Sequence, residues 1–152
     1  MTQTGKQIAA LPMRWNKSGE LQVLMVTSRD TKRWIMPKGW TMNGKKPWTA
    51  AEIEALEEAG AIGQIGQDVV GVYTYKKRLG KGKAMLCEVD VYPMMVERLK
   101  TNWKERGQRK RKWFSAKSAA KRVSEPKLAK LLKTLNKKPE SQPVIAEFLK
   151  AS

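Results

Sequence analysis

The most restrictive feature of this 152-residue chain is the stretch 47–75, which contains no lysine or arginine. Elsewhere the chain is strongly basic, with 31 Lys and Arg residues against 14 Asp and Glu residues and a net charge of +17. Within the stretch, four carboxylates lie close together, at Glu52, Glu54, Glu57 and Glu58. An acidic island in a basic chain predicts a cation site. Carboxylate oxygens suit the hard divalent ions Mg²⁺ and Mn²⁺.

The composition is that of a globular protein, with 41% hydrophobic and 30% charged residues. A chain of this length predicts one domain over residues 1–152, with its C-terminal helices (116–151) packed on it. The single cysteine, Cys87, excludes an internal disulfide and suits a reducing compartment. No segment resembles a signal peptide or a membrane span, so we expect a cytoplasmic protein without a membrane partner. The absence of histidine excludes His-based catalysis and the usual zinc sites.

Apolar patterns predict strands that interleave with helices, which indicates an α/β fold with helices packed on a mixed sheet. The expected strands are 6–14, 21–27, 34–36, 69–75, 84–94 and 112–114, and the expected helices are 50–59, 116–123, 125–135 and 144–150. In the third helix, four leucines form a core-facing stripe: Leu128, Leu131, Leu132 and Leu135.

The acidic helix carries both a start and a stop signal. Thr49 is the expected N-cap, with Glu52 as its capping-box partner, and Gly60 is the expected C-cap. The remaining three carboxylates have the spacing i, i+3 and i+4, so they project from one side of the helix. Each like-charge pair is unfavourable by a few tenths of a kcal/mol, a penalty that a bound cation removes. The alternative is an ordinary solvated acidic face.

The residues from Gly39 to Ala61 resemble the Nudix box, the signature of the Nudix hydrolases. In that signature a glycine is followed, at fixed spacing, by an Arg-Glu pair, a Glu-Glu pair and a second glycine. Here Gly39, Glu54, Glu57, Glu58 and Gly60 occupy the matching positions. The preceding segment, 34–39, resembles the strand and the phosphate-facing loop that lead into the box. The resemblance implies a Nudix-type α/β/α sandwich with a mixed β-sheet.

Two positions depart from the family pattern. Lys45 stands where the family has its first glutamate, and Ile53 replaces the arginine. In the family these two side chains pair and brace the loop against the helix. The double departure leaves no single buried charge unpaired, so it affects the bracing more than the metal site.

Further segments resemble the branch that hydrolyses diphosphoinositol polyphosphates and diadenosine polyphosphates. These are 29–34, the basic hairpin 76–83, and a Trp-x-Glu segment (103–105) placed before Arg-x-x-x-Trp-Phe (109–114).

The resemblance implies hydrolysis of a diphosphate linked to another moiety by water, with Mg²⁺ or Mn²⁺ as cofactor. By position, Glu54, Glu57 and Glu58 would bind the metal, together with the carbonyl of Gly39. The general base would be Glu54 or Glu105. Six cations are expected near the substrate phosphates, with ordinary surface exposure as the alternative for each: Arg29, Arg33, Lys38, Arg78, Arg109 and Arg111.

The expected partner is an anionic phosphorylated small molecule, because the high positive charge favours a substrate with many phosphates. A dinucleoside polyphosphate and a diphosphoinositol polyphosphate both fit. One alternative is an RNA-associated Nudix protein, either a 5′-end pyrophosphohydrolase or an RNA-binding module. Another is a catalytically degenerate domain that binds a ligand. Trp40 and Trp48 flank the loop, where helix packing is the expected role and stacking on a substrate ring the alternative.

Overall fold

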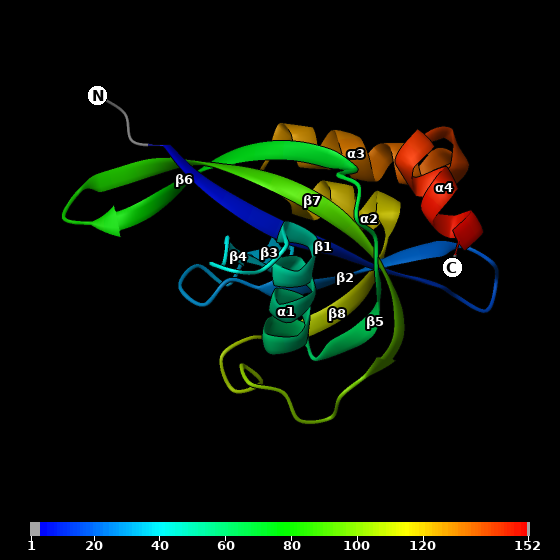
Figure 1. Ribbon diagram of the computed structural model, residues 1–152, viewed down its shortest axis with the longest axis horizontal. Coiled ribbons are helices and arrows are strands. Elements are labelled where there is room, and N and C mark those ends of the chain that lie inside the picture. The colour runs from blue at the N-terminus through cyan, green and yellow to red at the C-terminus, as the bar shows by residue number, and fades with distance from the viewer. Residues whose placement is uncertain (1–3, 152) are drawn as a thin grey trace.

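The computed structural model describes residues 4–151, in which one mixed sheet carries helices against both faces (Figure 1). The strands are β1 (Thr4–Trp15), β2 (Leu21–Thr27), β3 (Trp34–Ile35), β4 (Lys38–Trp40), β5 (Ala61–Ile65), β6 (Gly71–Gly80), β7 (Lys83–Leu99) and β8 (Arg111–Ser115). The helices are α1 (Pro47–Ala59), α2 (Ala116–Arg122), α3 (Pro126–Lys137) and α4 (Pro143–Ala151), with a 3₁₀ turn, η1 (Pro139–Ser141), before α4.

Strand β1 lies at the centre of the sheet. It pairs in parallel with β7, and the other strand pairs of the described residues are antiparallel. Strands β2 and β3 lie on one side of β1, and β7 and β5 on the other. Strands β4, β6 and β8 pair with β1, β7 and β2 respectively. Because β4 pairs with β1, Gly39 lies opposite Ile8, which fixes the loop before α1 against the centre of the sheet.

Alternate residues of β1 enter two separate cores. Ile8 and Ala10 belong to the core under α1, whereas Ala9 and Leu11 belong to the core under α2, α3 and α4. This alternation follows from the two-residue repeat of a strand that is buried on both faces. The expected α/β/α sandwich with a mixed sheet is thereby confirmed. The leucine stripe of α3 also packs inward as expected, because Leu128, Leu132 and Leu135 are buried and Leu131 is half-buried.

Helix α1 begins earlier than the sequence predicted. Thr49 is not the N-cap. That position belongs to Lys46, which makes no side-chain capping bond. The helix starts at Pro47 because the fixed φ of proline suits a first helical turn, where its missing N–H is not needed. The end was predicted correctly, since Gly60 takes a left-handed φ of 64° and its N–H donates to the carbonyl of Leu56.

Two short strands were missed in the sequence. Residues 38–40 were expected to be loop but pair with β1 as β4, and residues 61–65 pair with β7 as β5. Cys87 is buried and free. No helix within residues 4–151 combines the length and the apolar character needed to cross a membrane.

Candidate active site

The carboxylate of Glu54 lies directly on the backbone of Gly39. A Cβ atom at Gly39 would stand only 2.3 Å from Oε2 of Glu54, which is closer than such atoms approach. Glycine is therefore required for α1 and β4 to come this close. Burial, together with the charges of Glu57 and Glu105, raises the pKa of Glu54 to about 7.

Glu58 lies deeper in the same corner, on the buried side of α1. Its Oε1 accepts a hydrogen bond from the backbone N–H of Lys38 at 3.3 Å. Burial raises the pKa of Glu58 to about 7, with a further contribution from Glu54 and Glu105, although the neighbouring Arg109 acts in the opposite direction. The first residues of β4 and the acidic face of α1 are thus joined at one point.

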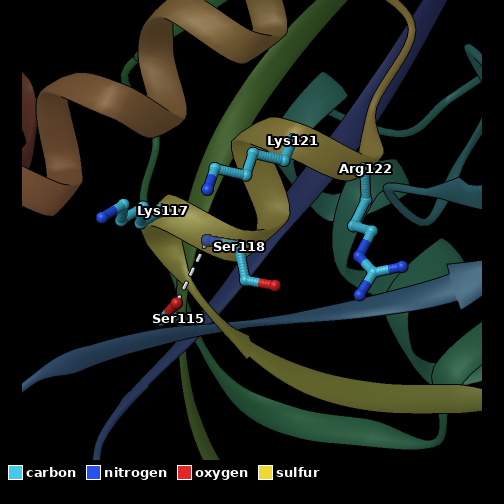
Figure 2. Close-up of a pocket in the computed structure, with 5 residues that line it drawn as sticks. All are labelled: Ser115, Lys117, Ser118, Lys121 and Arg122. Atoms are coloured by element: carbon cyan, nitrogen blue, oxygen red, sulfur yellow. Dashed lines mark hydrogen bonds between the residues drawn. The ribbon is translucent and has the colours of Figure 1, made fainter.

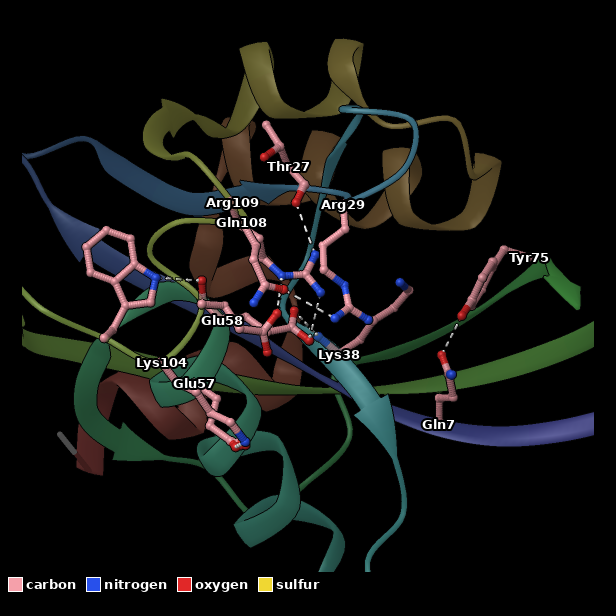
Figure 3. Close-up of polar contacts among 12 residues, drawn as sticks. Gln7, Thr27, Arg29, Lys38, Glu57, Glu58, Tyr75, Lys104, Gln108 and Arg109 are labelled. Carbon is pink, nitrogen blue, oxygen red and sulfur yellow. Dashed lines mark hydrogen bonds and ion pairs between the residues drawn. The ribbon is translucent and has the colours of Figure 1, made fainter.

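Arg109 links the carboxylates to the loop that precedes β8 (Figure 3). One terminal nitrogen lies 3.5 Å from Oε2 of Glu58, and its Nε donates to Oε1 of Glu105 at 2.7 Å. The other terminal nitrogen donates to the carbonyl of Thr27 at 3.0 Å. Arg109 therefore fixes Glu58 and Glu105 relative to each other and to the end of β2.

Glu57 lies at the edge of this corner, with its side chain 25% exposed. Its carboxylate pairs with Lys104 at 3.3 Å, and the lysine side chain is 71% exposed. The carbonyl of Glu57 accepts the N–H of Glu105 at 3.0 Å. The structure thus brings Glu54, Glu58 and Glu105 together and leaves the side chain of Glu57 at the rim.

The donor set suits a hard divalent cation. Every candidate ligand is an oxygen, and the raised pKa values of Glu54 and Glu58 reflect burial that disfavours the ionised carboxylates, a cost that a bound cation would offset. Within residues 4–151, no three acidic side chains already stand close enough to share an ion. Instead, Glu58 is paired with Arg109 and Glu57 with Lys104.

Arg109, described above, is one of the six expected phosphate-binding cations, and three more lie in β4 or in the segment between β2 and β3. Arg29 donates to the side chain of Gln108 at 3.3 Å. Arg33 donates to Ser124 at 2.6 Å. Burial lowers the pKa of Lys38, whose Nζ lies 4.7 Å from the centre of the Tyr75 ring. A pocket of about 570 Å³ opens beside them, lined by residues that include Thr27, Trp34 and Arg109.

The other two expected cations lie elsewhere. Arg78 is exposed on the β6–β7 hairpin, and by strand alternation its side chain points to the opposite face from Lys77. Arg111 donates to the carbonyl of Ala59 at 2.9 Å and stacks over Trp103 at 3.8 Å. Their contact with phosphate stays a prediction.

The sequence interpretation missed how the end of α1 is braced. Trp103 donates from Nε1 to the carbonyl of Glu58 at 3.1 Å, next to the bond from Arg111. These two side chains satisfy carbonyls that have no partner within the helix. A signal was present, because the last turn of α1 contains no basic residue that could do so itself.

The departures from the box are also visible in the structure. Lys45 is exposed and Ile53 is half-buried. The charged pair that braces the loop before α1 in the family is therefore absent, and other side chains pack there. Trp48 and Met42 pack against the core under α1.

No family model matches the chain, but curated proteins do. It is 32% identical to Nudix hydrolase 16, mitochondrial, of Arabidopsis thaliana over 73% of this chain and 63% of that protein. It is 31% identical to human diphosphoinositol polyphosphate phosphohydrolase 3-beta over 76% of this chain and 67% of that protein. The chain spans 63%, 52% and 56% of the length of three Arabidopsis relatives, Nudix hydrolases 16, 13 and 21.

Solved structures share the fold. The Ap4A hydrolase of C. elegans superposes with a TM-score of 0.60 at 21% identity, covering 98% of this chain and 99% of that one. The MutT protein of Methanosarcina mazei superposes with a TM-score of 0.62 at 16% identity, covering 89% and 94%. Gly39, Glu54 and Glu58 of the box meet at one corner, and the chain is more than 30% identical to curated Nudix hydrolases. The chain therefore belongs to the Nudix hydrolase family.

Proposed function

We propose that the chain is a metal-dependent pyrophosphohydrolase that cleaves a diphosphate linked to another moiety. The observation that carries this proposal is the placement of Glu54 and Glu58 against Gly39 and the start of β4. A buried carboxylate and a half-buried one, both with raised pKa values and with Arg109 and Lys38 nearby, would provide a binding site for a metal and its phosphate ligands in one place. Family membership supports the same reaction class.

The metal would be Mg²⁺ or Mn²⁺, held by Glu54, Glu57, Glu58 and the carbonyl of Gly39. When bound, it would supply charge neutralisation for the phosphates and increase the acidity of water. The exposed pair between Glu57 and Lys104 is worth less than about 1 kcal/mol, so it does not compete strongly with a divalent ion.

The general base is Glu54 or Glu105. Glu105 already accepts a bond from Arg109 at 2.7 Å, which orients it but also engages one of its oxygens. Single-turnover rates of Glu54→Gln and Glu105→Gln at saturating metal distinguish the two. The base is the residue whose loss removes the chemical step while bound substrate is retained.

The substrate would carry many phosphates. Arg29, Arg33, Lys38 and Arg109 come from three separate segments, and Lys38 and Arg109 both contact Glu58. Positioning and charge neutralisation supply most of the catalysis in phosphoryl transfer, so several cations favour an extended polyphosphate. A dinucleoside polyphosphate and a diphosphoinositol polyphosphate remain the two proposed classes. Relatives named for each of them support this choice.

The test is product release from a panel of nucleoside, dinucleoside and inositol diphosphates, with Mg²⁺, with Mn²⁺ and with chelator. Metal-dependent turnover of any member supports the proposal, and the best substrate identifies the class. A panel that stays intact overturns it. Binding without turnover would then indicate a degenerate ligand-binding domain, as the residues Lys45 and Ile53 allow.

A second candidate function, RNA binding, is favoured by a basic face on α2 and α3. This basic face consists of six exposed cations: Lys117, Lys121, Arg122, Lys127, Lys130 and Lys133. The only acid in residues 115–138 is Glu125, which is buried and lies 3.9 Å from Arg33. A pocket of about 500 Å³ at the start of α2 is lined by three of these cations with Ser115 and Ser118 (Figure 2).

Phosphate contacts would make RNA binding strongly dependent on salt. The measurement is fluorescence anisotropy of a labelled single-stranded RNA across a salt series. The double variant Lys121→Glu/Arg122→Glu should reduce the affinity for RNA and the slope of log affinity against log salt concentration. Glu57→Gln should leave both quantities unchanged. Lys17→Glu, in the exposed β1–β2 turn, controls for the loss of net charge. If Lys17→Glu reduces the affinity as much per reversed charge as the double variant does, RNA binding is not specific to the basic face.

The proposed compartment is the cytoplasm, because Cys87 is a free thiol and free thiols suit a reducing environment. The plant relatives carry the names mitochondrial and chloroplastic, so fractionation of cells that express the tagged protein is the direct test.

A further inference from the structure

Trp40 is an exposed tryptophan beside the candidate active site. It follows Gly39 in β4, and its side chain is 44% exposed. Trp40 is absent from both cores, whereas Trp48, on the other side of the loop, packs against the core under α1. The helix-packing role expected for both tryptophans therefore applies to Trp48 alone.

The indole ring of Trp40 is seated on the backbone of β1. A Cβ atom at Gly5 would stand 2.8 Å from Cζ3 of the ring and 2.7 Å from the sulfur of Met85 in β7. Lys77, which is paired with Met85 across β6 and β7, holds its Nζ 5.9 Å from the ring centre. One side of the ring thus packs against Gly5 and Met85, while much of Trp40 stays exposed to solvent. We call Trp40 and Lys77 the platform.

The platform is connected to the carboxylates through Lys38. In a strand, residues i and i+2 share a face, so Lys38 and Trp40 point to the same side of β4. The backbone N–H of Lys38 bonds Glu58, and its Nζ lies over Tyr75. Tyr75 and Lys77 also share a face, on β6. The contacts from the carboxylates therefore run from Glu58 to Lys38 and Tyr75, and the platform lies on the same side of β4 as Lys38. This side is opposite to the one on which Gly39 meets Glu54.

We propose that the platform stacks on the nucleobase of a nucleoside polyphosphate whose diphosphate lies at Glu54 and Glu58. This inference rests on the proposed function and names the substrate class. An open aromatic ring stacks on any base, and a nearby cation can neutralise the phosphates attached to it. An inositol polyphosphate has no aromatic face, so it gains nothing from the ring. The platform thus selects dinucleoside polyphosphates over diphosphoinositol polyphosphates.

The purely structural alternative is that Trp40 only covers the backbone of β1. The two accounts differ in their dependence on substrate. If Trp40 only shapes the sheet, its removal affects every substrate alike. If it stacks on a base, its removal affects nucleotides alone.

The experiment compares steady-state kinetics of the wild type, Trp40→Ala, Trp40→Phe and Trp15→Ala on diadenosine tetraphosphate and diphosphoinositol pentakisphosphate. Trp15 is a matched control because it is 48% exposed at the far end of β1. We expect Trp40→Ala to raise KM for the dinucleotide about tenfold, with an unchanged KM for the inositol substrate. Trp40→Phe should retain most of the affinity, and Trp15→Ala should match the wild type. An unchanged dinucleotide KM, or an equal rise for both substrates, overturns the proposal.

A second variant disturbs the ring without removing it. Gly5→Ala places a methyl group where the ring of Trp40 now lies, so it should produce the same selective rise in KM. If neither substrate is hydrolysed, the proposed function fails, and calorimetric binding of ADP and inositol hexakisphosphate tests the platform separately. In that measurement, Trp40→Ala should weaken the binding of ADP about tenfold and leave the affinity for inositol hexakisphosphate unchanged. Equal ADP affinity of the wild type and Trp40→Ala would overturn the proposal.

Discussion

The guanidinium of Arg109 lies 3.5 Å from the carboxylate of Glu58, and the two side chains are only 8% and 7% exposed. This pair joins the loop before β8 to the acidic face of α1. Its burial means that neither charge is well solvated, so each depends on the other. The same arginine also holds Glu105. In the absence of a metal ion, Arg109 is the principal positive charge that the carboxylates share.

Arg109→Ala is therefore expected to lower the free energy of unfolding of the metal-free protein by about 3 kcal/mol, because it leaves buried carboxylates unpaired. The measurement is urea unfolding in the presence of a chelator. Arg106→Ala is the matched control, since Arg106 is exposed and bonds only Asn102 among the described side chains. Equal midpoints for the two variants would contradict the assigned role of Arg109.

Gly39→Ala should displace Glu54, because the new methyl group would meet its carboxylate at 2.3 Å. We expect a loss of stability of about 1–3 kcal/mol from overpacking and a fall in kcat/KM of at least about tenfold, since a small misplacement of a ligand is enough. Gly107→Ala is the control, because a Cβ there meets nothing within 4 Å. A Gly39→Ala enzyme with wild-type kcat/KM would show that Glu54 is not a ligand.

The stability of the metal-free protein should fall as the pH rises from about 4.5 to about 7. Glutamates ordinarily ionise near 4.5, but the folded pKa values of Glu54 and Glu58 are about 7. The folded state therefore binds more protons in this window, and ionisation in the folded state is unfavourable. After allowance for partial exposure, each group should contribute roughly 1 kcal/mol.

Thermal unfolding at about pH 5 and about pH 8 measures this effect. The double variant Glu54→Gln/Glu58→Gln lacks both titrating groups, so its stability should not decline over this pH range. Added Mg²⁺ should also reduce the decline in the wild type, because it stabilises the ionised carboxylates. A decline of the same size in the double variant would assign it to other groups.

Trp103→Phe should lower the free energy of unfolding by about 1 kcal/mol, because it removes the donor that satisfies the carbonyl of Glu58. Chemical unfolding measures this loss of stability. Trp15→Phe is the control at an exposed tryptophan, and we expect its free energy of unfolding to stay near that of the wild type. If the two variants are equally stable, the carbonyl must be satisfied in another way.

The acidic helix could be predicted because its signals are local. Glu54, Glu57 and Glu58 have helical spacing, and Gly60 ends the helix as a left-handed glycine does. The start was misread because Thr49 matched a capping box, whereas the fixed φ of Pro47 determined the first turn.

Strands β4 and β5 could not be predicted because their pairing is decided by distant partners. β5 contains Gly63, where a Cβ atom would stand 2.0 Å from the carbonyl oxygen of Met95. The register shifts between Ile62 and Gly63, so this strand lacks a regular alternation. β4 is only Lys38–Trp40 and gains its pairing from β1.

The site could be predicted only in part, for the same reason. The residues Gly39, Glu54 and Glu58 of the box do meet at one corner, because fixed spacing encodes the turn of a helix, but their role in metal binding stays a prediction. The pairing of Glu58 with Arg109 depends on the approach of two distant segments, which spacing along one helix does not determine.

The most direct test of the central claim is metal-dependent turnover of the best substrate by Glu58→Gln beside Glu52→Gln. Both residues lie on α1, but only Glu58 belongs to the buried corner. We predict that Glu58→Gln lowers kcat by about a hundredfold or more and weakens Mn²⁺ binding measured by calorimetry, while Glu52→Gln matches the wild type. Equal activity and equal Mn²⁺ affinity of the two variants would contradict the account.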